Sequence, residues 1–362
     1  MSESLLNYPA PRFSIDETLM PQLTRDLLHL QIEESNAGMR TLNVRFLAFG
    51  PGEETPRENL LYLDGALFDF GSRVSVDIGP EDNRRTLFNG LVSAIEADFE
   101  EGHEPEVTLY AEDELMKLRL SRRMASYENM SDADIAGEIA EKNGLAAQAD
   151  ADGPVYDAVQ QWNMSDLAFL RDRAKRIQAD IWFEDGTLYF QSRSRRNGSE
   201  LTLVQGNHLL QLSACGDLSR QRSAVHVCGY DAAQREVIDE TAGADVIRAE
   251  ATGGRSGPEI LAEAFAGDRI SYRLRDVPLN SEEARAWADN EMLRRARSFV
   301  TVRGVTRGTP DMNVGSRLTL ERVGRPFEGD GYYVTGVRHS YDLARGYRTS
   351  FVAERATIGG GR

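Results

Sequence analysis

Short segments in which apolar and polar residues alternate occur toward both ends of the chain. The clearest examples are 73–76, 107–112, 317–320 and 349–354, which are rich in β-branched and aromatic residues. Segments of this kind end at Gly, Asp or Pro, and this pattern is typical of half-buried antiparallel strands. The two ends of the chain are therefore predicted to form β-structure.

The hydrophobic spacing becomes helical over residues 115–200. Ser131, followed by an acidic Asp134, is a typical N-cap arrangement, and Gly144 is a typical helix end. The pattern therefore predicts a helix between these positions, and a second helix beginning at Ser165. This region is predicted to be a compact α/β insert.

Two further features complete the predicted elements. Asp185–Gly186 lies between two apolar runs, which predicts a hairpin turn. The region 246–297 opens with loop chemistry, and helices are expected over 258–266 and 281–297, with a short strand near 269–275. This region is predicted to be a second, mainly helical insert.

The chain contains an internal repeat. Residues 92–112 align with 334–354 without a gap at an offset of 242, and 71–76 align with 315–320 at an offset of 244. Conservative pairs over 21 ungapped residues favour duplication over chance similarity of two β-meanders.

Two weaker matches extend the repeat toward the N-terminus. Residues 27–30 resemble 209–212 at an offset of 182, and 42–46 resemble 225–229 at nearly the same offset. Because the offset grows from about 182 to about 244, the second copy is predicted to carry an insertion of roughly 60 residues.

The predicted fold class is α+β and mainly β, with two antiparallel β-domains related by duplication, each sheet-like or barrel-like. Each copy is followed or interrupted by a small insert containing helices. The predicted segments are a first β-domain over 1–114, an α/β insert over 115–200, the first part of the second β-domain over 201–245, a helical insert over 246–297, and the rest of the second β-domain with a C-terminal tail over 298–362.

Composition excludes several classes of protein. The 362 residues include 58 acidic and 42 basic side chains, a net charge of −16, which is unfavourable for a non-specific nucleic-acid binder. No apolar run is long enough to span a bilayer, no secretory signal is expected at the N-terminus, and two cysteines make no disulfide framework. Only three of the basic residues are lysines, and arginine suits ion pairs buried at subunit interfaces.

Candidate metal and nucleotide sites lack the spacing that their chemistry needs. His208, Cys215, His226 and Cys228 are possible zinc ligand types, but no Cys-x-x-Cys or His-x(3–5)-His pair is present, so we interpret them as half-buried strand residues. The glycine-rich run 253–257 lacks the lysine of a phosphate-binding loop. The sequence predicts no metal and no cofactor.

The acidic and basic clusters are also interpreted as turns or surface features, and not as functional sites. Residues 150–153 resemble a fragment of a calcium loop without the downstream ligands, and Glu100–Glu101 is a pair that any acidic surface contains. Two arginine clusters lack interleaved aromatic residues, so we interpret them as solvated or partner-facing surface and not as nucleic-acid sites. They consist of Arg193, Arg195 and Arg196, and of Arg294, Arg295 and Arg297. No catalytic residue is predicted.

Several phrases together resemble the phage late control D family, the baseplate hub of contractile tails. These phrases are 162–170 (WNMSDLAFL), 185–190 (DGTLYF), 311–316 (DMNVGS) and 331–341 (GYYVTGVRHSY). The chain is also similar to the N-terminal hub part of type VI secretion valine-glycine-repeat spike proteins. The resemblance covers about 12–356 and involves packing and turn residues.

The resemblance implies a structural baseplate hub of a contractile phage tail or a phage-like contractile injection system. Such hubs are homotrimers with two tube-like β-barrels per chain, so three chains present six similar units and adapt a three-fold spike to a six-fold inner tube. Because the chain ends at Arg362, the spike is expected to be a separate protein. The expected partners are other copies of the chain, the spike and the inner tube protein, with other baseplate proteins and cargo as further candidates; neither nucleic acid nor a membrane span is expected.

The hub is expected to be synthesised and assembled in the cytoplasm, as part of a virion tail or of an extracellular or cytoplasmic injection particle. The sequence leaves open whether the parent particle is a phage, a tailocin or an injection system. Two other functions also remain open. One is a tail-associated hydrolase acting on peptidoglycan or protein, and the other is an adaptor whose insert at 115–200 or 246–297 docks an effector.

The acidic charge is confined to the first copy. Residues 1–114 hold 23 acidic and 8 basic side chains, a net of −15, whereas the remaining 248 residues hold 35 and 34. We expect a trimer to alternate acidic and neutral units, or the two copies to face different partners.

Overall fold

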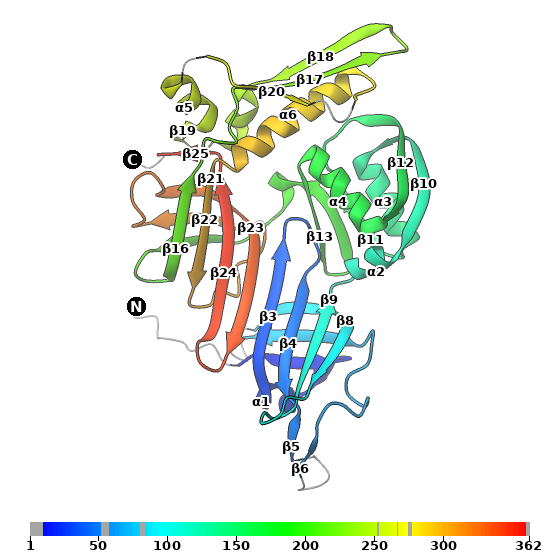
Figure 1. The fold of residues 1–362 in the computed structure, drawn as a ribbon, viewed down its shortest axis with the longest axis vertical. Helices are drawn as coiled ribbons and strands as arrows, with labels where there is room; N and C mark the ends of the chain where they lie inside the picture. The colour runs from blue at the N-terminus through cyan, green and yellow to red at the C-terminus, as the bar shows by residue number, and fades with distance from the viewer. Residues whose placement is uncertain are drawn as a thin grey trace.

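One large, almost entirely antiparallel sheet organises the molecule (Figure 1). The computed structural model describes residues 10–51, 58–79, 84–251, 253–265, 267–273 and 277–359. The initial residues and Arg362, considered above, lie outside these ranges. Eight strands of the sheet lie side by side in the order β16 (Leu209–Gly216), β21 (Val300–Thr306), β24 (Gly346–Arg355), β23 (Gly329–Asp342), β3 (Leu27–Ser35), β4 (Thr41–Leu47), β9 (Glu106–Glu112) and β8 (Arg85–Asp98).

The sheet continues behind this row as a second layer. The additional strands are β7 (Arg73–Ile78), β1 (Arg12–Ile15) and β2 (Thr18–Leu19) after β8, and β22 (Arg317–Glu321) with β15 (Glu200–Val204) beside β23. β7 and β1 cross behind β4 and β9 in Figure 1, and their inward side chains share one hydrophobic cluster with those of β3 and β4. A separate cluster fills the space between β22 and the row from β16 to β23. Two cores are therefore buried on the same face of the row, while its other face stays bare.

The strand order of the large sheet is similar in its two halves. The order β3-β4-β9-β8-β7-β1 in the first half corresponds to β16-β21-β24-β23-β22-β15 in the second, although β1 runs antiparallel to β7 whereas β15 runs parallel to β22. The match includes irregularities, because a β-bulge occurs at the same place in both copies of two different strand pairs. The bulges lie at Val92/Ala94 and Val334/Gly336, offset by 242, and at Leu27/His29 and Leu209/Gln211, offset by 182.

One part of the repeat alignment is wrong. Residues 225–229 were matched to 42–46, which lie in β4, but they belong to β17 (Ala224–Asp231), outside the large sheet. The strand that takes the place of β4 is β21, because it lies between β16 and β24. The apolar residues that alternate along β17 are buried in a different core, beneath α6. Their alternating pattern of burial is similar to that of β4, and this similarity produced the false match. The segment boundaries at 114, 200, 245 and 297 stay predictions.

The α/β insert forms as its local signals predict. Ser131 and Asp134 make the reciprocal capping box of the helix α3, and the Ser165 hydroxyl accepts a hydrogen bond from the Ala168 amide at the start of α4. Asp185–Gly186 joins β13 and β14. The elements of this insert are α2 (Leu115–Leu120), β10 (Arg122–Ser131), α3 (Asp132–Lys142), β11 (Ala146–Ala149), β12 (Val155–Ser165), α4 (Asp166–Ile177), β13 (Ala179–Glu184), β14 (Thr187–Ser192) and the 3₁₀ helix η1 (Arg193–Arg195).

The second insert is a three-stranded sheet covered by one long helix. The helix α6 (Ser281–Arg297) packs Trp287 and Met292 against β17, β18 (Glu236–Ala242) and the 3₁₀ helix η2 (Ala244–Glu250). Both helices predicted here, and the short strand, are confirmed. The remaining elements are β19 (Arg255–Ser256), α5 (Gly257–Ala264), β20 (Ile270–Arg273) and β25 (Thr357–Ile358), and, near the N-terminus, α1 (Pro21–Arg25), β5 (Phe49–Pro51) and β6 (Glu58–Leu60).

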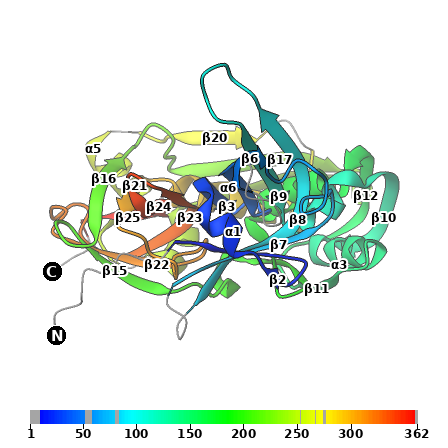
Figure 2. The ribbon, with the colours of Figure 1, turned by 90° about the horizontal axis from the view of Figure 1, so that it is seen from below.

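Seen from below, the α/β insert with β10 and β12 lies at the opposite side of the molecule from β15 and β22 (Figure 2). The fold is thus mainly β with some helices. No helix within the described ranges has the length and apolar character needed to cross a membrane.

The two copies fill one equivalent core position in different ways. Val44 of β4 lies opposite Leu109 in the first copy, and Gly304 of β21 lies opposite Phe351 in the second. A Cβ atom on Gly304 would lie 2.5 Å from the Phe351 ring, so the glycine makes room for the aromatic side chain.

We therefore expect Gly304→Val to lower the free energy of unfolding by about 1–3 kcal/mol through overpacking. Phe351→Leu alone should also destabilise, because it leaves a void beside Gly304. The double variant recreates the valine–leucine pair of the first copy. Its loss in free energy of unfolding should therefore be smaller than the sum of the two single losses, by about 1 kcal/mol or more. Urea unfolding of the four proteins measures this coupling, and strictly additive costs would contradict it.

Candidate functional site: an assembly surface

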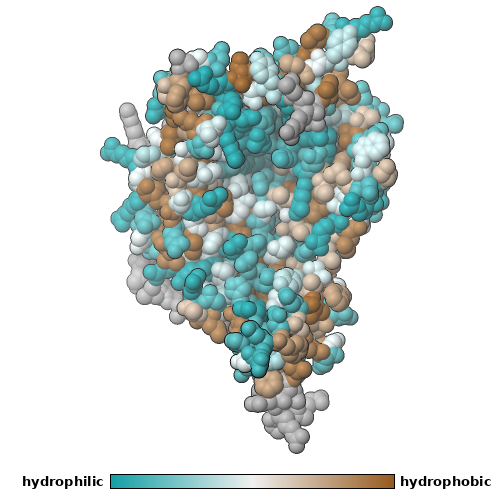
Figure 3. Space-filling model, in the orientation of Figure 1, coloured by the Kyte–Doolittle hydropathy of each residue, from teal (hydrophilic) through white to brown (hydrophobic). Residues whose placement is uncertain are grey.

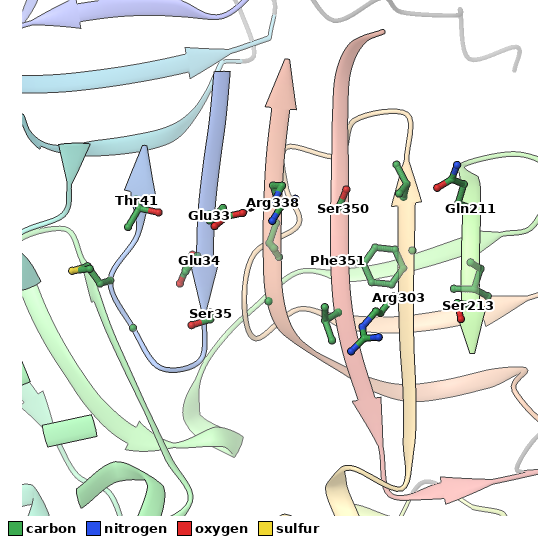
Figure 4. Close-up of a pocket in the computed structure, with 18 of the residues that line it drawn as sticks. Glu33, Glu34, Ser35, Thr41, Gln211, Ser213, Arg303, Arg338, Ser350 and Phe351 are labelled. Atoms are coloured by element: carbon green, nitrogen blue, oxygen red, sulfur yellow. Dashed lines mark hydrogen bonds and ion pairs between the residues drawn. The ribbon is translucent and has the colours of Figure 1, made fainter. Parts of the chain in front are cut away.

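The junction between the two repeats is a continuous antiparallel ladder. β3 pairs with β23 from Ser35 opposite Gly336 to His29 opposite Asp342. On the bare face of the sheet, Arg338 donates a hydrogen bond to Glu33 across the junction, and the two side chains point toward each other in Figure 4. The ladder thereby joins the two copies through backbone hydrogen bonds and this ion pair, and a second ion pair between the copies links Arg85 to Asp311 at 2.6 Å.

The bare face is hollowed at this junction. A concavity of about 830 Å³ extends over β16, β21, β24, β23 and β3. Polar side chains are prominent on it, and Figure 4 shows them along successive strands. They include Glu33, Ser35, Gln211, Ser213, Arg303, Arg338 and Ser350.

Both ends of the eight-strand row have a backbone edge without a strand partner among the described residues. β23 is paired on both sides, with β24 and with β3. The corresponding half of β8, from Ala94 to Asp98, pairs with β9 alone, and β16 from Gln211 to Gly216 pairs with β21 alone. An edge of this kind presents backbone N–H and C=O groups that another strand can bind.

These two edges are equivalent to the two strands that meet inside the chain. The offset of 182 places β16 in the position of β3, and the offset of 242 places β8 in the position of β23. The intrachain junction thus has an unoccupied counterpart at each end of the row.

A buried charged joint fixes the α/β insert against both repeats. Glu34 of β3 accepts hydrogen bonds from Arg40, at 2.7 Å, and from Arg196. Arg196 is only 5% exposed, and its guanidinium carbon lies 4.5 Å from the centre of the Trp182 ring. Burial raises the pKa of Glu34, but Arg40 and Arg196 overcome this and hold the pKa below its ordinary value.

A second part of the joint is centred on Tyr333 of β23. Its hydroxyl donates to Asp180 of β13, and two guanidinium groups lie against its ring. The distances to the ring centre are 3.7 Å for Arg193 and 4.4 Å for Arg317. Arg193 also donates to Glu354 of β24, so the insert contacts the sheet through a stacked, ion-paired aromatic.

The interpretation of the arginine clusters as solvated or partner-facing surface is wrong for three of their members. Arg193 and Arg196 are buried in the joint, and Arg297 is buried beside Glu250. Their carboxylate partners come from distant parts of the chain, which local spacing cannot reveal. Arg195 does lie at the surface, where it pairs with Asp150.

Of the residues considered as metal ligands, the structure places Cys215 apart from His226 and Cys228, which both lie near Asp239. Cys215 lies on the open edge of β16, His226 packs beside Tyr272 in the smaller sheet, and Cys228 contacts Asp239 there. Across the described ranges, no group of three or more His, Cys, Asp or Glu side chains could hold a metal ion.

The other sequence candidates have structural positions. Ser256, within the glycine-rich run, caps α5, and Asp150 forms a surface ion pair with Arg195. Glu100 and Glu101 are exposed in the turn between β8 and β9. The open edges were missed by sequence reasoning, although the repeat offsets carried the signal, since they show which strands must be equivalent.

Comparison with known proteins gives one family and a set of similar structures. The family model described as the Alg8 N-terminal domain matches residues 53–342, more than half of the chain. No curated protein matches the sequence.

Three solved structures share the fold at low sequence identity. The 43 kDa tail protein of prophage MuSo2 from Shewanella oneidensis has a TM-score of 0.68 at 13% identity, over 96% of this chain and 98% of that one. A tail protein from Neisseria meningitidis MC58 has a TM-score of 0.64 at 13% identity, over 96% of each chain. The Escherichia coli protein c3393, a type VI secretion component similar to the T4 tail proteins gp27 and gp5, has a TM-score of 0.56 at 14% identity, over 99% of this chain and 77% of that one.

One histidine at the repeat junction is buried. His339 of β23 is 7% exposed; its Nδ1 lies 2.7 Å from the Tyr347 hydroxyl and its Nε2 lies 3.1 Å from the Met312 carbonyl oxygen. The neutral ring with its proton on Nε2 satisfies both contacts. Burial, together with Arg40, lowers the pKa of His339 to about 4.

We expect the free energy of unfolding to fall as the pH drops from about 6.5 to about 4, because the unfolded chain takes up a proton that the folded chain resists. The loss attributable to His339 is up to about 3 kcal/mol. His339→Gln cannot titrate, so its unfolding free energy should vary less over this range. Urea unfolding at pH 7, 5.5 and 4.5 compares the two proteins, and parallel profiles would contradict the assignment.

Proposed function

The chain belongs to the family described as the Alg8 N-terminal domain, and from its fold and its two open strand edges we propose that it is a structural baseplate hub of a contractile phage tail or contractile injection system. In this proposal three copies form a ring that adapts a three-fold spike to a six-fold inner tube. Each half of the large sheet, with its second layer, acts as one tube-like β-barrel, so the trimer presents six similar units.

The comparisons support this proposal at the level of the fold. Two of the similar structures are described as tail proteins and a third as a type VI secretion component. We transfer to this chain only a structural role and no catalytic activity.

The observation that carries the proposal is the equivalence of the two open edges with the β3–β23 junction. If β16 of one copy pairs with β8 of the next as β3 pairs with β23, every junction around the ring has the same geometry. Such head-to-tail contacts close into a ring when the rotation per subunit is right. Repeated junctions of one kind satisfy all the exposed backbone groups at both edges.

Closure by three copies gives a sheet with three times eight, or 24, strands around the ring. With neighbouring strands about 4.8 Å apart, the backbone would measure about 115 Å around and about 37 Å across before strand tilt is added. The second layer and both cores lie on one face of the row, and in this proposal the bare, hollowed face lines the channel.

The partners follow from this arrangement. The six similar units offer matching surfaces to an inner tube of six-fold symmetry, while the inserts, present once per chain, repeat only three times and suit a three-fold spike. The acidic first copy, with a net charge of −15 over residues 1–114, would alternate with a neutral second copy around the ring.

The strand equivalence predicts one contact between chains at residue level. Glu33 and Arg338 are directly opposed in the β3–β23 ladder. The offset of 182 makes Cys215 the equivalent of Glu33, and the offset of 242 makes Glu96 the equivalent of Arg338. Cys215 of one copy should therefore lie opposite Glu96 of the next. Directly opposed residues in an antiparallel pair have Cα atoms about 4.5–5.5 Å apart, within the range of a disulfide. We therefore expect Glu96→Cys, in a Cys228→Ser background, to cross-link through the native Cys215 under mild oxidation.

Non-reducing gel electrophoresis should show a ladder ending at about 121 kDa, three times the mass of 40.3 kDa. Adding Cys215→Ser should abolish it, and moving the new cysteine to Asp98 should weaken it, because Asp98 lies two residue pairs further along the ladder. Absence of cross-linking in a protein that is trimeric by native mass spectrometry would overturn the predicted register. A particle map without three-fold density between tube and spike would overturn the hub.

A further inference from the structure

A second hollow lies at the rim of the bare face, between α4, α6 and the turn after β3. Its volume is about 410 Å³, and Arg171 of α4 lines both this hollow and the larger one at the repeat junction. Figure 3 shows a recessed, mostly hydrophilic surface in this part of the molecule. We call it the basic hollow.

Cationic side chains outnumber acidic ones in the basic hollow by six to two. The cations are Arg171, Lys175, Arg193, Arg220, Arg294 and Arg297, and the acids are Asp180 and Glu354. This is a local excess of positive charge on a chain whose net charge is −16.

Three of the cations have carboxylate partners. Arg193 pairs with Glu354, Arg294 with Glu291 at 2.7 Å, and Arg297 with Glu250. The other acid of the hollow, Asp180, accepts the Tyr333 hydroxyl and lies 3.8 Å from Arg196. The acids of the hollow are therefore already engaged by groups within the joint.

The other three cations have no carboxylate within ion-pair distance in the described part of the chain. Arg171 is half-buried and donates to two backbone oxygens, of Ala37 at 2.7 Å and of Gly38 at 3.0 Å. Burial lowers its pKa, since nearby carboxylates compensate only in part. Lys175 of α4 and Arg220 are exposed at the rim and make no ion pair. A partly desolvated guanidinium gains most from an anion that arrives with its own charge.

We propose that the basic hollow binds carboxylate groups of an acidic polypeptide segment, with Arg171, Lys175 and Arg220 as the contacting residues. The lining contains no aromatic side chain on which a nucleic-acid base could stack. A long polyanion would also be repelled by the acidic first copy, whereas a short acidic peptide brings its charge only to the hollow. The site is complete within one chain and does not require the trimer.

The test uses the full-length protein and a fluorescein-labelled peptide of eight glutamates, with eight glutamines as the neutral probe. Fluorescence anisotropy at low salt should show binding of the glutamate peptide that weakens as salt is raised. The triple variant Arg171→Gln, Lys175→Gln, Arg220→Gln should bind it about tenfold more weakly or worse.

A matched control removes the same charge elsewhere. Arg235, Arg322 and Arg345 are exposed outside the basic hollow, and changing all three to Gln should alter the affinity less than about twofold. Circular dichroism and native mass of both triple variants show whether fold and assembly are kept, so a failure of the hub proposal remains separate.

Three results would overturn the proposal. The first is equal affinity of the hollow variant and the control for the glutamate peptide. The second is equal binding of the glutamine peptide by the unmodified protein. The third is tighter binding of a single-stranded oligonucleotide of the same charge, which would assign the hollow to nucleic acid instead.

Discussion

The hydrogen-bonded ladder between β3 and β23 is the constraint on which the rest of the molecule depends. It joins the edges of the two copies beside their two hydrophobic clusters, the first of which also includes Tyr347 of β24, and it leaves one matching edge open at each end of the row. Backbone N–H and C=O groups that are not paired within a chain must be paired with water or with another chain. In the proposed ring, the geometry of the inner junction would therefore define the geometry of the junction between copies.

The charged joint around Glu34 and Tyr333 sets where the α/β insert sits relative to that ladder. Buried ion pairs add little net stability compared with apolar packing, but an unpaired partner is costly, so they favour one arrangement over others. Arg196 reaches Glu34 of the first copy, while Arg193 reaches Glu354 of the second. The insert is thus held by both copies at once, and a change in their relative angle would separate charges that are hidden from water.

Local sequence signals predicted much of this fold, whereas contacts between residues far apart in the sequence could not be predicted. The capping residues Ser131 and Ser165, and the ungapped match of β8–β9 with β23–β24, depend on neighbouring positions and could be recognised in the sequence. The equivalence of β4 and β21 could not, because Val44 and Gly304 fill the same core position with very different volumes. The partners of Arg193 and Arg196 lie more than 150 residues away, so no spacing could identify them as buried.

The side chains on the two open edges differ in a way that restricts how copies can meet. Glu96 and Asp98 make the β8 edge acidic, whereas Gln211, Ser213 and Cys215 leave the β16 edge uncharged. Two β8 edges brought together would place like charges opposite each other, which is destabilising. Pairing of β8 with β16 carries no such penalty. In the proposed assembly, the acidic β8 edge would disfavour a symmetric β8–β8 dimer, which would leave both β16 edges open, and would favour the head-to-tail contact through which a ring can close.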